Sequence, residues 1–310
     1  MRIAIFGSTS LIAKDLIRSF AAQSRDELVL YARRPEIVRQ WLASVSLSSH
    51  YAVIDFGAFS LAEQFDVIFN FVGVGNPAQA AVIGASIFEV TLKYDEMALD
   101  YVRQHHDCRY IFLSSGAAYG ASFDAPVDEN TKAVVAINSR QQQDWYATAK
   151  LHAECRHRAL PHLPIIDIRV FNYFSHTQDM DARFLMTDIL RAVRDKTVLQ
   201  TSSDYIVRDF LHPSDFHQLI SKLLDAPAMN TAVDCYSCAP IDKPALLAAM
   251  QDKFDLLYKT VPSSPNSTAT GNKPYYYSKN RRAAAFGYEP TLSSLEGIIL
   301  ETSILLQAKL

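Results

Sequence analysis

A tyrosine and a lysine spaced for proton transfer occur in the stretch DWYATAKLHAEC, residues 144–155. Residues four apart share one face of a helix, so Tyr146 and Lys150 are expected to point into the same cleft. A phenol has a pKa near 10, and an ammonium about 4 Å away would favour the phenolate by roughly 4 kcal/mol at an effective dielectric constant of about 20. That energy equals about three pK units. We therefore predict that Lys150 moves the pKa of Tyr146 toward neutrality and that the pair exchanges protons.

A serine precedes this pair at the end of a predicted strand. The stretch RYIFLSSGAAYG begins with an apolar run and then turns, so the hydroxyls of Ser114 and Ser115 would lie at the mouth of a sheet. From there a hydroxyl could hold a substrate carbonyl or alcohol. A Tyr and a Lys four apart are common on helices, and a strand-end serine is commonly satisfied by the backbone. Their combination in one chain of alternating strands and helices favours catalysis.

The first strand, RIAIF, is followed by the turn GSTSLIA, which suits a dinucleotide phosphate. Such a site needs a tight turn, close approach of backbone N–H groups to the pyrophosphate, and close packing of helix on strand. The pattern G-x-x-G-x-x-G would meet these needs, but here only Gly7 is glycine, and the small residues Ser10 and Ala13 replace the others. Because any strand–helix turn favours small residues, the turn alone leaves an ordinary structural role open.

The end of the second strand bears on the choice of cofactor. An NAD site usually places an Asp or Glu there for the ribose 2′-OH, whereas this chain has Arg33 and Arg34, with no carboxylate before Glu36. The guanidinium group of arginine binds two phosphate oxygens at once, so we favour NADP, which carries a 2′-phosphate, over NAD. The alternative is that both arginines are merely solvated residues before a helix. Asp55, after the third strand, would accept from an adenine amino group or cap the next helix.

Short apolar runs alternate with helical patterns over the first 175 residues. The predicted strands are RIAIF, ELVLY, YAVI, VIFNFV, RYIFLS and PIIDIRVF, and the predicted helices cover 10–22, 35–44, 78–104 and 144–160. Continuously apolar strands separated by helices indicate right-handed βαβ units and a parallel sheet covered on both faces. We therefore predict an α/β fold with a doubly wound parallel sheet of the Rossmann type.

The pattern loosens after residue 175. We predict a dinucleotide-binding Rossmann domain at 1–175 and a smaller substrate-binding region at 176–310, interleaved with the end of the sheet. This region contains the predicted helix DARFLMTDILRAVRD, another from about 214, and the Ser/Pro/Asn-rich loop VPSSPNSTATGNKP. The final segment, TLSSLEGIILETSILLQAKL, is interpreted as an amphipathic packing helix because Glu296 and Glu301 interrupt its apolar run.

The composition excludes several classes of protein. The 310 residues are 49% hydrophobic and 20% charged, with a net charge of −3, which is ordinary for a soluble globular protein. No basic surface for nucleic acid and no Lys/Arg cluster for an anionic membrane is evident. No apolar run reaches about 18 residues and no signal peptide precedes the first strand, so we expect no membrane span and a cytoplasmic location.

Other clusters of reactive or aromatic residues have plain interpretations. The histidines lack helical stacking and paired carboxylates, so we expect no metal. The four cysteines include a CxxC without a second ligand pair, so we interpret them as ordinary thiols. A run of three tyrosines is interpreted as a strand, with stacking on a base as the alternative. The residues concerned are His105, His106, His152, His157, His162, Cys108, Cys155, Cys235, Cys238, Tyr275, Tyr276 and Tyr277.

Seven stretches occur in the order typical of one enzyme family, namely GSTSLIA, DFGAF, FNFVG, FLSSGAAYG, YATAK, RVFNYF and RDFLHPSDF, followed by GYEP at 287–290. Through them the chain resembles the extended branch of the short-chain dehydrogenase/reductase superfamily, whose members act largely on nucleotide-sugars. YATAK after FLSSGAAYG is the most specific part. The chain departs from the family pattern in the two missing glycines, in Asn70-Phe71-Val72 where His-x-Ala is usual, and in the absence of an evident Arg-x-x-Asp.

The resemblance implies roles for individual residues. Tyr146 would be the general acid/base, Lys150 the modulator of its pKa and a ligand of the nicotinamide ribose, and Ser115 the hydroxyl that orients the carbonyl. The implied cofactor contacts are Gly7, Ser10, Leu11, Ile12, Arg33, Arg34, Asp55, Phe71, Val72, Gly73, Lys150 and Phe171. The implied substrate contacts are Ser115, Asn172, Arg208 and Lys273. A turn asparagine and a strand-surface arginine are the plain alternatives for Asn172 and Arg208.

These features lead to a prediction of function. We predict an NADP-dependent reductase of a 4-keto nucleotide-sugar, with NAD as a possible cofactor. The alternatives are an NAD-dependent nucleotide-sugar epimerase or dehydratase, and a non-catalytic dinucleotide-binding regulator. A regulator would be marked by a broken Ser/Tyr/Lys set, and here the set is intact. By analogy with related enzymes, the helices at 78–104 and 144–160 would pair with a second copy, giving a homodimer through a four-helix bundle.

Overall fold

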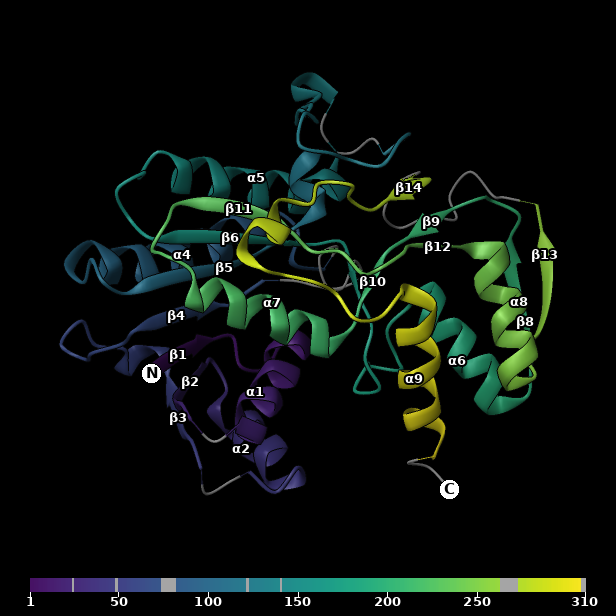
Figure 1. The fold of residues 1–310 in the computed structure, drawn as a ribbon, viewed down its shortest axis with the longest axis horizontal. Coiled ribbons are helices and arrows are strands. Elements are labelled where there is room, and N and C mark those ends of the chain that lie inside the picture. The colour runs from purple at the N-terminus through teal and green to yellow at the C-terminus, as the bar shows by residue number, and fades with distance from the viewer. Residues whose placement is uncertain are drawn as a thin grey trace.

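A seven-stranded sheet runs through the computed structural model, which describes residues 1–23, 25–47, 50–73, 82–120, 123–139, 141–262 and 273–307 (Figure 1). Every neighbouring pair is parallel, in the order β11-β6-β5-β4-β1-β2-β3. The strands are β1 (Arg2–Phe6), β2 (Glu27–Ala32), β3 (Ala52–Asp55), β4 (Val67–Asn70), β5 (Arg109–Ser115), β6 (Ile165–Val170) and β11 (Thr231–Asp234). The predicted doubly wound α/β fold is therefore confirmed.

Helices cover both faces of this sheet and create two cores. One face packs against α1 (Leu11–Gln23), α2 (Pro35–Ser44) and α7 (Pro213–Asp225). The other packs against α4 (Ser86–Gln104) and α5 (Trp145–Arg158). Alternate side chains of a strand point to opposite faces, so Ile3 and Ile5 of β1 enter the first core while Ala4 and Phe6 enter the second. This double burial explains why the strands are continuously apolar.

The predicted elements of the first half agree with the observed bounds to within a few residues. The helix predicted at 78–104 corresponds to α4, but residues 74–81 lie outside the described residues. The fourth strand was predicted too long, because the strand VIFNFV ends at Asn70. Asn70 turns back on the chain, where its Oδ1 accepts from the backbone N–H of Val72 (2.9 Å), so Phe71 and Val72 belong to the turn.

The carboxyl ends of the strands meet at one edge of the sheet. Phe6 of β1 is in register with Tyr31 of β2 and with Asn70 of β4, so the turns that follow these strands open side by side. The strand order reverses between β1 and β4, and ligands of open α/β sheets bind in the crevice at such a reversal. Gly7 begins the turn at this point, and Ser115 ends β5 at the same edge.

The seventh strand, β11, comes from the region after residue 175 and was not predicted as a strand. It pairs with β6, and α7 packs beside α1 on the sheet (Figure 1). Both elements follow residue 175 in the chain, yet β11 extends the large sheet and α7 packs on it. The second region is thus interleaved with the end of the sheet. The proposed division at residue 175 remains a prediction.

A third core holds the smaller region together. It is formed by α6 (Leu185–Asp195), α8 (Lys243–Phe254) and α9 (Ser294–Gln307), with the parallel pair β8 (Val198–Ser202) and β13 (Leu257–Val261) beside them. The short strands are β7 (Asn172–Tyr173), β9 (Val207–Arg208), β10 (Phe210–Leu211), β12 (Ile241–Asp242) and β14 (Tyr275–Tyr276). Residues 263–272 of the predicted loop VPSSPNSTATGNKP lie outside the described residues. Within the described part of the chain, no helix has the length and apolarity needed to cross a membrane.

Candidate active site

The hydroxyls of Ser115 and Tyr146 meet at the carboxyl end of β5. Ser115 is buried at the end of this strand, and its Oγ accepts from the backbone N–H of Ala117 (3.2 Å) in the short 3-10 turn η2 (Gly116–Tyr119). Tyr146 lies in the first turn of α5 and forms a hydrogen bond with the Ser115 hydroxyl. The structure thus brings together the serine and tyrosine predicted to be catalytic.

Lys150 lies one turn further along α5, on the same face as Tyr146. Its Nζ lies 6.0 Å from the centroid of the Tyr146 ring and donates to the carbonyl of Leu113 on β5 (2.6 Å). The side chain is buried, and burial lowers the pKa of Lys150 to about 8. The ammonium is therefore held between the helix and the sheet by a backbone acceptor, in the cleft that the four-residue spacing predicted.

The pKa of Tyr146 shifts in the direction opposite to the prediction. Burial of the phenol raises its pKa, and the hydrogen bond with Ser115 offsets this only in part. The predicted lowering assumed an ammonium about 4 Å away in a medium of intermediate dielectric constant. In the structure, desolvation penalises the phenolate, and Lys150 is not among the groups that lower the pKa of Tyr146. In the protein alone, Tyr146 is consequently a phenol at neutral pH.

A second tyrosine, Tyr276, completes the environment of Ser115 and was not predicted to act there. Its hydroxyl lies 3.2 Å from Ser115 Oγ, and burial raises the pKa of Tyr276 strongly. Tyr276 belongs to β14, the strand that the run of three tyrosines predicted. The hydroxyl groups of Tyr146 and Tyr276 therefore both meet that of Ser115. Neither tyrosine is ionised at neutral pH, because the pKa of each is raised.

An aromatic cluster fixes Tyr276 in place. The Tyr276 ring lies 4.7 Å from that of Phe123 and 5.3 Å from that of Phe171, measured between centroids. Phe171 in turn lies against the backbone of Gly116, where any Cβ would overlap the ring. Phe171, predicted to contact the cofactor, is 8% exposed. Glycine at position 116, directly after Ser115, is therefore a packing requirement of this cluster.

Buried polar side chains attach α5 to the sheet below the site. Glu154 accepts from Ser114 Oγ (2.5 Å) and from the Arg169 guanidinium. His157 lies between the carboxylates of Asp167 (2.6 Å) and Asp95 (2.7 Å). Burial alone would lower the pKa of His157, but the two carboxylates outweigh it and raise the pKa to about 9. The histidine that we set aside as a metal ligand is thus part of a buried ion network.

The turn after β1 fits a dinucleotide. Gly7 has φ +77°, and a Cβ there would lie 2.8 Å from the backbone nitrogen of Val72 and 2.9 Å from the carbonyl carbon of Phe71. Only glycine permits this approach of two turns. Ala13 is fully buried between α1 and the sheet, so its methyl is accommodated where the family pattern has glycine. The first N–H groups of α1, at Leu11 and Ile12, have no intrahelical acceptor and are available to phosphate oxygens.

Three predicted contacts to the adenosine lie together beyond β2 and β3. Arg33 and Arg34 are exposed directly after β2. Asp55 is in register with Ala32, and its carboxylate accepts from the N–H of Gly57 (2.8 Å) as the cap of η1 (Phe56–Ala58). The capping alternative for Asp55 is therefore observed. Among the described residues neither arginine forms an ion pair with a carboxylate, so both guanidinium groups are available to an anion.

The turn after β4 contributes main chain rather than side chains. The Phe71 ring is buried in the core between Phe69 and Phe216, so only its backbone can reach a cofactor. Val72 is partly buried against the second core. A Cβ on Gly73 would lie 3.5 Å from Nζ of Lys150. The turn therefore passes close to the ammonium of Lys150.

The predicted substrate cations stand next to Tyr276. Arg208 Cζ and Lys273 Nζ lie 5.9 and 5.0 Å from the centroid of its ring. Burial lowers the pKa of Arg208 to about 10, and burial together with the charge of Arg208 lowers that of Lys273 to about 8. Asn172 donates to the carbonyl of Asp209 (3.2 Å). Two neighbouring, partly buried cations gain stability from an anion placed between them.

The remaining reactive groups do not join this site. Among the described residues, no three His, Cys, Asp or Glu side chains are placed to hold a metal ion. All four cysteines are free thiols, with Cys235 buried and Cys238 exposed. Burial raises the pKa of both thiols, which disfavours the reactive thiolate.

The solved structures that share this fold include three enzymes of nucleotide-sugars. The UDP-glucuronic acid 4-epimerase of Bacillus cereus, with UDP-glucuronic acid and NAD, is 15% identical over 99% of this chain and 100% of that chain, with a TM-score of 0.79. The UDP-N-acetylglucosamine 4-epimerase of Methanobrevibacter ruminantium, with UDP-N-acetylmuramic acid, is 13% identical. The match covers 100% of this chain and 99% of that chain, with a TM-score of 0.82. The dTDP-glucose 4,6-dehydratase of Bacillus anthracis, with NAD, is 14% identical. The match covers 98% of this chain and 96% of that chain, with a TM-score of 0.77.

The family follows from the sequence. No curated protein matches the chain at the threshold applied, and identities of this size to solved structures show the fold alone. A family model, however, described as the NAD dependent epimerase/dehydratase family, matches residues 3–239. That span holds the turn after β1, Ser115, Tyr146 and Lys150. The chain therefore belongs to the NAD dependent epimerase/dehydratase family, and with it to the extended short-chain dehydrogenase/reductase enzymes that the motifs indicated.

Proposed function

We propose that the protein is a nucleotide-sugar 4-epimerase that uses a nicotinamide dinucleotide. The observation that carries the proposal is the convergence of Ser115, Tyr146 and Lys150 at the end of β5, beside the turns after β1 and β4. A bound NAD supplies the hydride acceptor. Tyr146 moves the proton of the sugar hydroxyl, Ser115 binds the same oxygen, and Lys150 places a positive charge in the cleft.

The cations near Tyr276 support a nucleotide diphosphate as the activating group. Arg208 and Lys273 are close enough for Arg208 to lower the pKa of Lys273, and both are partly buried. A diphosphate between them would replace this repulsion by attraction, and the Arg208 fork suits phosphate oxygens. The sugar attached to that diphosphate would then extend toward Ser115, because Tyr276 contacts both the cations and the serine.

A dehydratase is less well supported than an epimerase. Elimination of water from a sugar needs an acid and a base in addition to the tyrosine, since one proton leaves carbon and another joins the departing hydroxyl. The residues that follow Ser115 are Gly116, Ala117 and Ala118. The turn η2 then ends at Tyr119, whose hydroxyl is already bonded to Asp234 and Arg169, so the turn supplies no carboxylate for those steps.

A reductase of 4-keto nucleotide-sugars is the second candidate. The specific observation in its favour is the pair of exposed arginines after β2, which would bind the 2′-phosphate of NADPH. The two reactions differ in their effect on the cofactor. An epimerase returns the hydride and leaves the cofactor unchanged, whereas a reductase consumes one NADPH for each keto-sugar.

The assay uses this difference. Nucleotide-sugars are incubated with the protein and NAD, and 4-keto nucleotide-sugars with NADPH, while products and nicotinamide absorbance are followed. We expect a C4 epimer with no net absorbance change. Stoichiometric loss of NADPH would assign the reductase, and failure of every nucleotide-sugar to react with either bound cofactor would contradict both.

Tyr146→Phe removes the proton-transfer group and leaves the ring. We expect turnover to fall by at least about 100-fold, because general acid–base catalysis typically contributes that factor or more. Tyr205→Phe, which alters an exposed tyrosine in the smaller region, is the control and should keep full activity. Undiminished turnover of Tyr146→Phe would refute the role of the phenol.

A further inference from the structure

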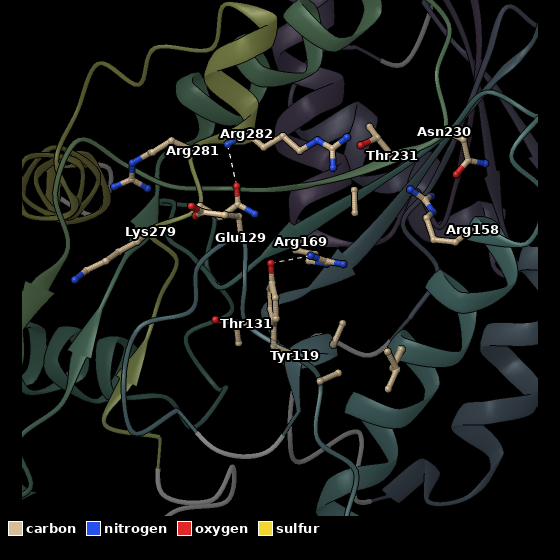
Figure 2. A pocket seen from close by; sticks show the side chains of 15 residues that line it. Tyr119, Glu129, Thr131, Arg158, Arg169, Asn230, Thr231, Lys279, Arg281 and Arg282 are labelled. Carbon is tan, nitrogen blue, oxygen red and sulfur yellow. Dashed lines mark hydrogen bonds between the residues drawn. The ribbon is translucent and has the colours of Figure 1, made fainter.

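A second cavity, of about 820 Å³, is lined by residues of α5, β6 and β11 and by the segments 118–133 and 279–282 (Figure 2). Ser115, Tyr146 and Lys150 do not line it. Pockets for small molecules have volumes on the order of 300–1,000 Å³, so this cavity is large enough for a nucleotide-sized ligand. Five cationic side chains line it, together with one carboxylate, that of Glu129.

The five cations differ in how far their charges are neutralised. Arg169 is bonded to Glu154 and Tyr119 and lies 3.4 Å from Asp234, so its charge is satisfied within the protein. Arg281 stacks over the Tyr236 ring, with its Cζ 4.0 Å from the centroid. These residues form the wall of the cavity. Of the five cations, Arg158, Arg282 and Lys279 therefore remain as candidates to bind a ligand in the cavity.

Arg158 presents unused donors. Its Nη2 donates to Asp167 (2.8 Å), but its Nε and Nη1 are buried and have no hydrogen-bond partner among the described residues. Burial lowers the pKa of Arg158, and the charges of Arg169 and Arg282 lower it further. The carboxylates of Asp167 and Glu154 oppose this lowering. The guanidinium nevertheless keeps two nitrogen atoms without a hydrogen-bond partner in the described part of the chain.

Thr231 adds a polar atom at the same place. It is 3% exposed, and its Oγ1 also has no hydrogen-bond partner among the described residues. In Figure 2 this hydroxyl is drawn between the guanidinium groups of Arg282 and Arg158, while Glu129 is drawn on the side away from Arg158. Buried polar atoms in native proteins are nearly always paired, so two unpaired side chains in one cavity point to a ligand that pairs them.

We propose that this cavity binds a small phosphate-bearing anion with at least two phosphoryl groups. The donors of Arg158, Thr231 and Arg282 suit the oxygens of a phosphoryl group, because guanidinium forks and hydroxyls are preferred partners of phosphate. The volume leaves room for a second phosphoryl group toward Lys279 and for a nucleoside. A nucleoside diphosphate and inorganic pyrophosphate share this chemistry.

Calorimetric titration of the full chain with pyrophosphate and, separately, with ADP tests the proposal, with NAD present at saturation so that the dinucleotide site after β1 is filled. Arg208→Gln serves as the background because it weakens anion binding at the active site and leaves the second cavity intact. We expect a binding event that persists in Arg208→Gln and weakens by at least about tenfold when Arg158→Gln or Arg282→Gln is added, since each removes a charge-assisted donor. Arg194→Gln, at the exposed end of α6, is the charge-matched control.

Each outcome decides the proposal. Tighter binding of ADP than of pyrophosphate identifies a nucleotide ligand, and equal binding identifies the diphosphate alone. An event that disappears in Arg208→Gln, or that neither cavity variant weakens, overturns the assignment, as does the absence of any binding. Arg282 is exposed, so Arg282→Gln keeps the test valid if the buried change at Arg158 impairs folding.

Discussion

The Ser115 hydroxyl has only one proton to donate, and its surroundings determine where that proton points. A serine oxygen accepts two hydrogen bonds and donates one. The N–H of Ala117 occupies one acceptor position. Tyr276 remains protonated because its pKa is raised, and we expect it to donate into the other. The proton of Ser115 is then left for Tyr146 or for a substrate oxygen, which would make Tyr276 a positioning residue.

Tyr276→Phe tests this arrangement. Loss of one neutral hydrogen bond costs about 0.5–1.5 kcal/mol, so we expect kcat to fall roughly 2- to 12-fold while KM changes little. Tyr275→Phe, the neighbouring tyrosine of β14, is the control and should leave kcat unchanged. An effect on KM alone would mean that Tyr276 shapes the binding site without orienting the serine.

Arg33 and Arg34 decide cofactor preference if they bind a 2′-phosphate. We expect the double variant Arg33→Ala/Arg34→Ala to raise the Kd of NADPH by at least about tenfold and to leave that of NADH nearly unchanged, because charge-assisted contacts to the phosphate would be lost. Fluorescence titration of both reduced cofactors gives the two constants. A parallel loss of affinity for NADH would show that the arginines act on a feature common to both cofactors.

The residues of the candidate active site differ in how far the sequence could predict them. Tyr146 and Lys150 are four residues apart on a helix, and Ser115 ends an apolar strand, so local patterns bring them out. Tyr276 could not be found in this way, because its contact with Ser115 spans 161 residues. The direction of the Tyr146 pKa shift also depends on burial, which the spacing does not contain.

At the scale of elements, α5 is unusual because its inner face is polar. Lys150, Glu154 and His157 are all buried against the sheet. Their partners come from α4, β5 and β6, so the helix is held by directional bonds as well as by packing. Directional bonds fix the rotation and height of a helix, and the role proposed for Tyr146 in its first turn requires this.

The His157 network makes stability depend on pH. Its folded pKa of about 9 exceeds the ordinary value of 6.5, so the stabilisation is complete below pH 6.5 and is lost as pH rises through about 9. We expect the free energy of unfolding in urea to decline over this window. His157→Gln should flatten the decline, whereas the exposed His106→Gln should not. A wild-type profile that is level up to pH 9 would contradict the assigned shift.

The elements that the sequence did not predict are those whose formation depends on distant partners. The strand TAVD of β11 has only four residues and ends in an aspartate. It becomes a strand because β6 offers an open edge for pairing. By contrast, β1, β2, β5 and β6 have five to seven residues and combine apolar runs with turn residues, so their positions follow from the local pattern. The strand AVID of β3 is as short as β11 and also ends in an aspartate, but it follows the alternation of strands and helices in the first half of the chain.

At the scale of the whole molecule, α4 and α5 lie side by side on one face of the sheet (Figure 1). We predict that they pair with a second copy, and Leu92 of α4 is 40% exposed on that face. Light scattering should give twice the chain mass of 34.7 kDa. Leu92→Lys should shift the mass toward the monomer, while Leu257→Lys, at an equally apolar exposed position of β13, should not. A monomer at every concentration would remove this interface.

The contact between Ser115 and Tyr276 also has a consequence for biosynthesis. Domains fold from the N-terminus as the ribosome extends them, and six strands of the sheet precede residue 171. A nascent chain can therefore hold a folded nucleotide turn, with its serine, tyrosine and lysine in place, while the strand that bears Tyr276 is still untranslated. Premature termination shortly before β14 would remove the Tyr276 hydroxyl and leave Ser115 unsupported on one side.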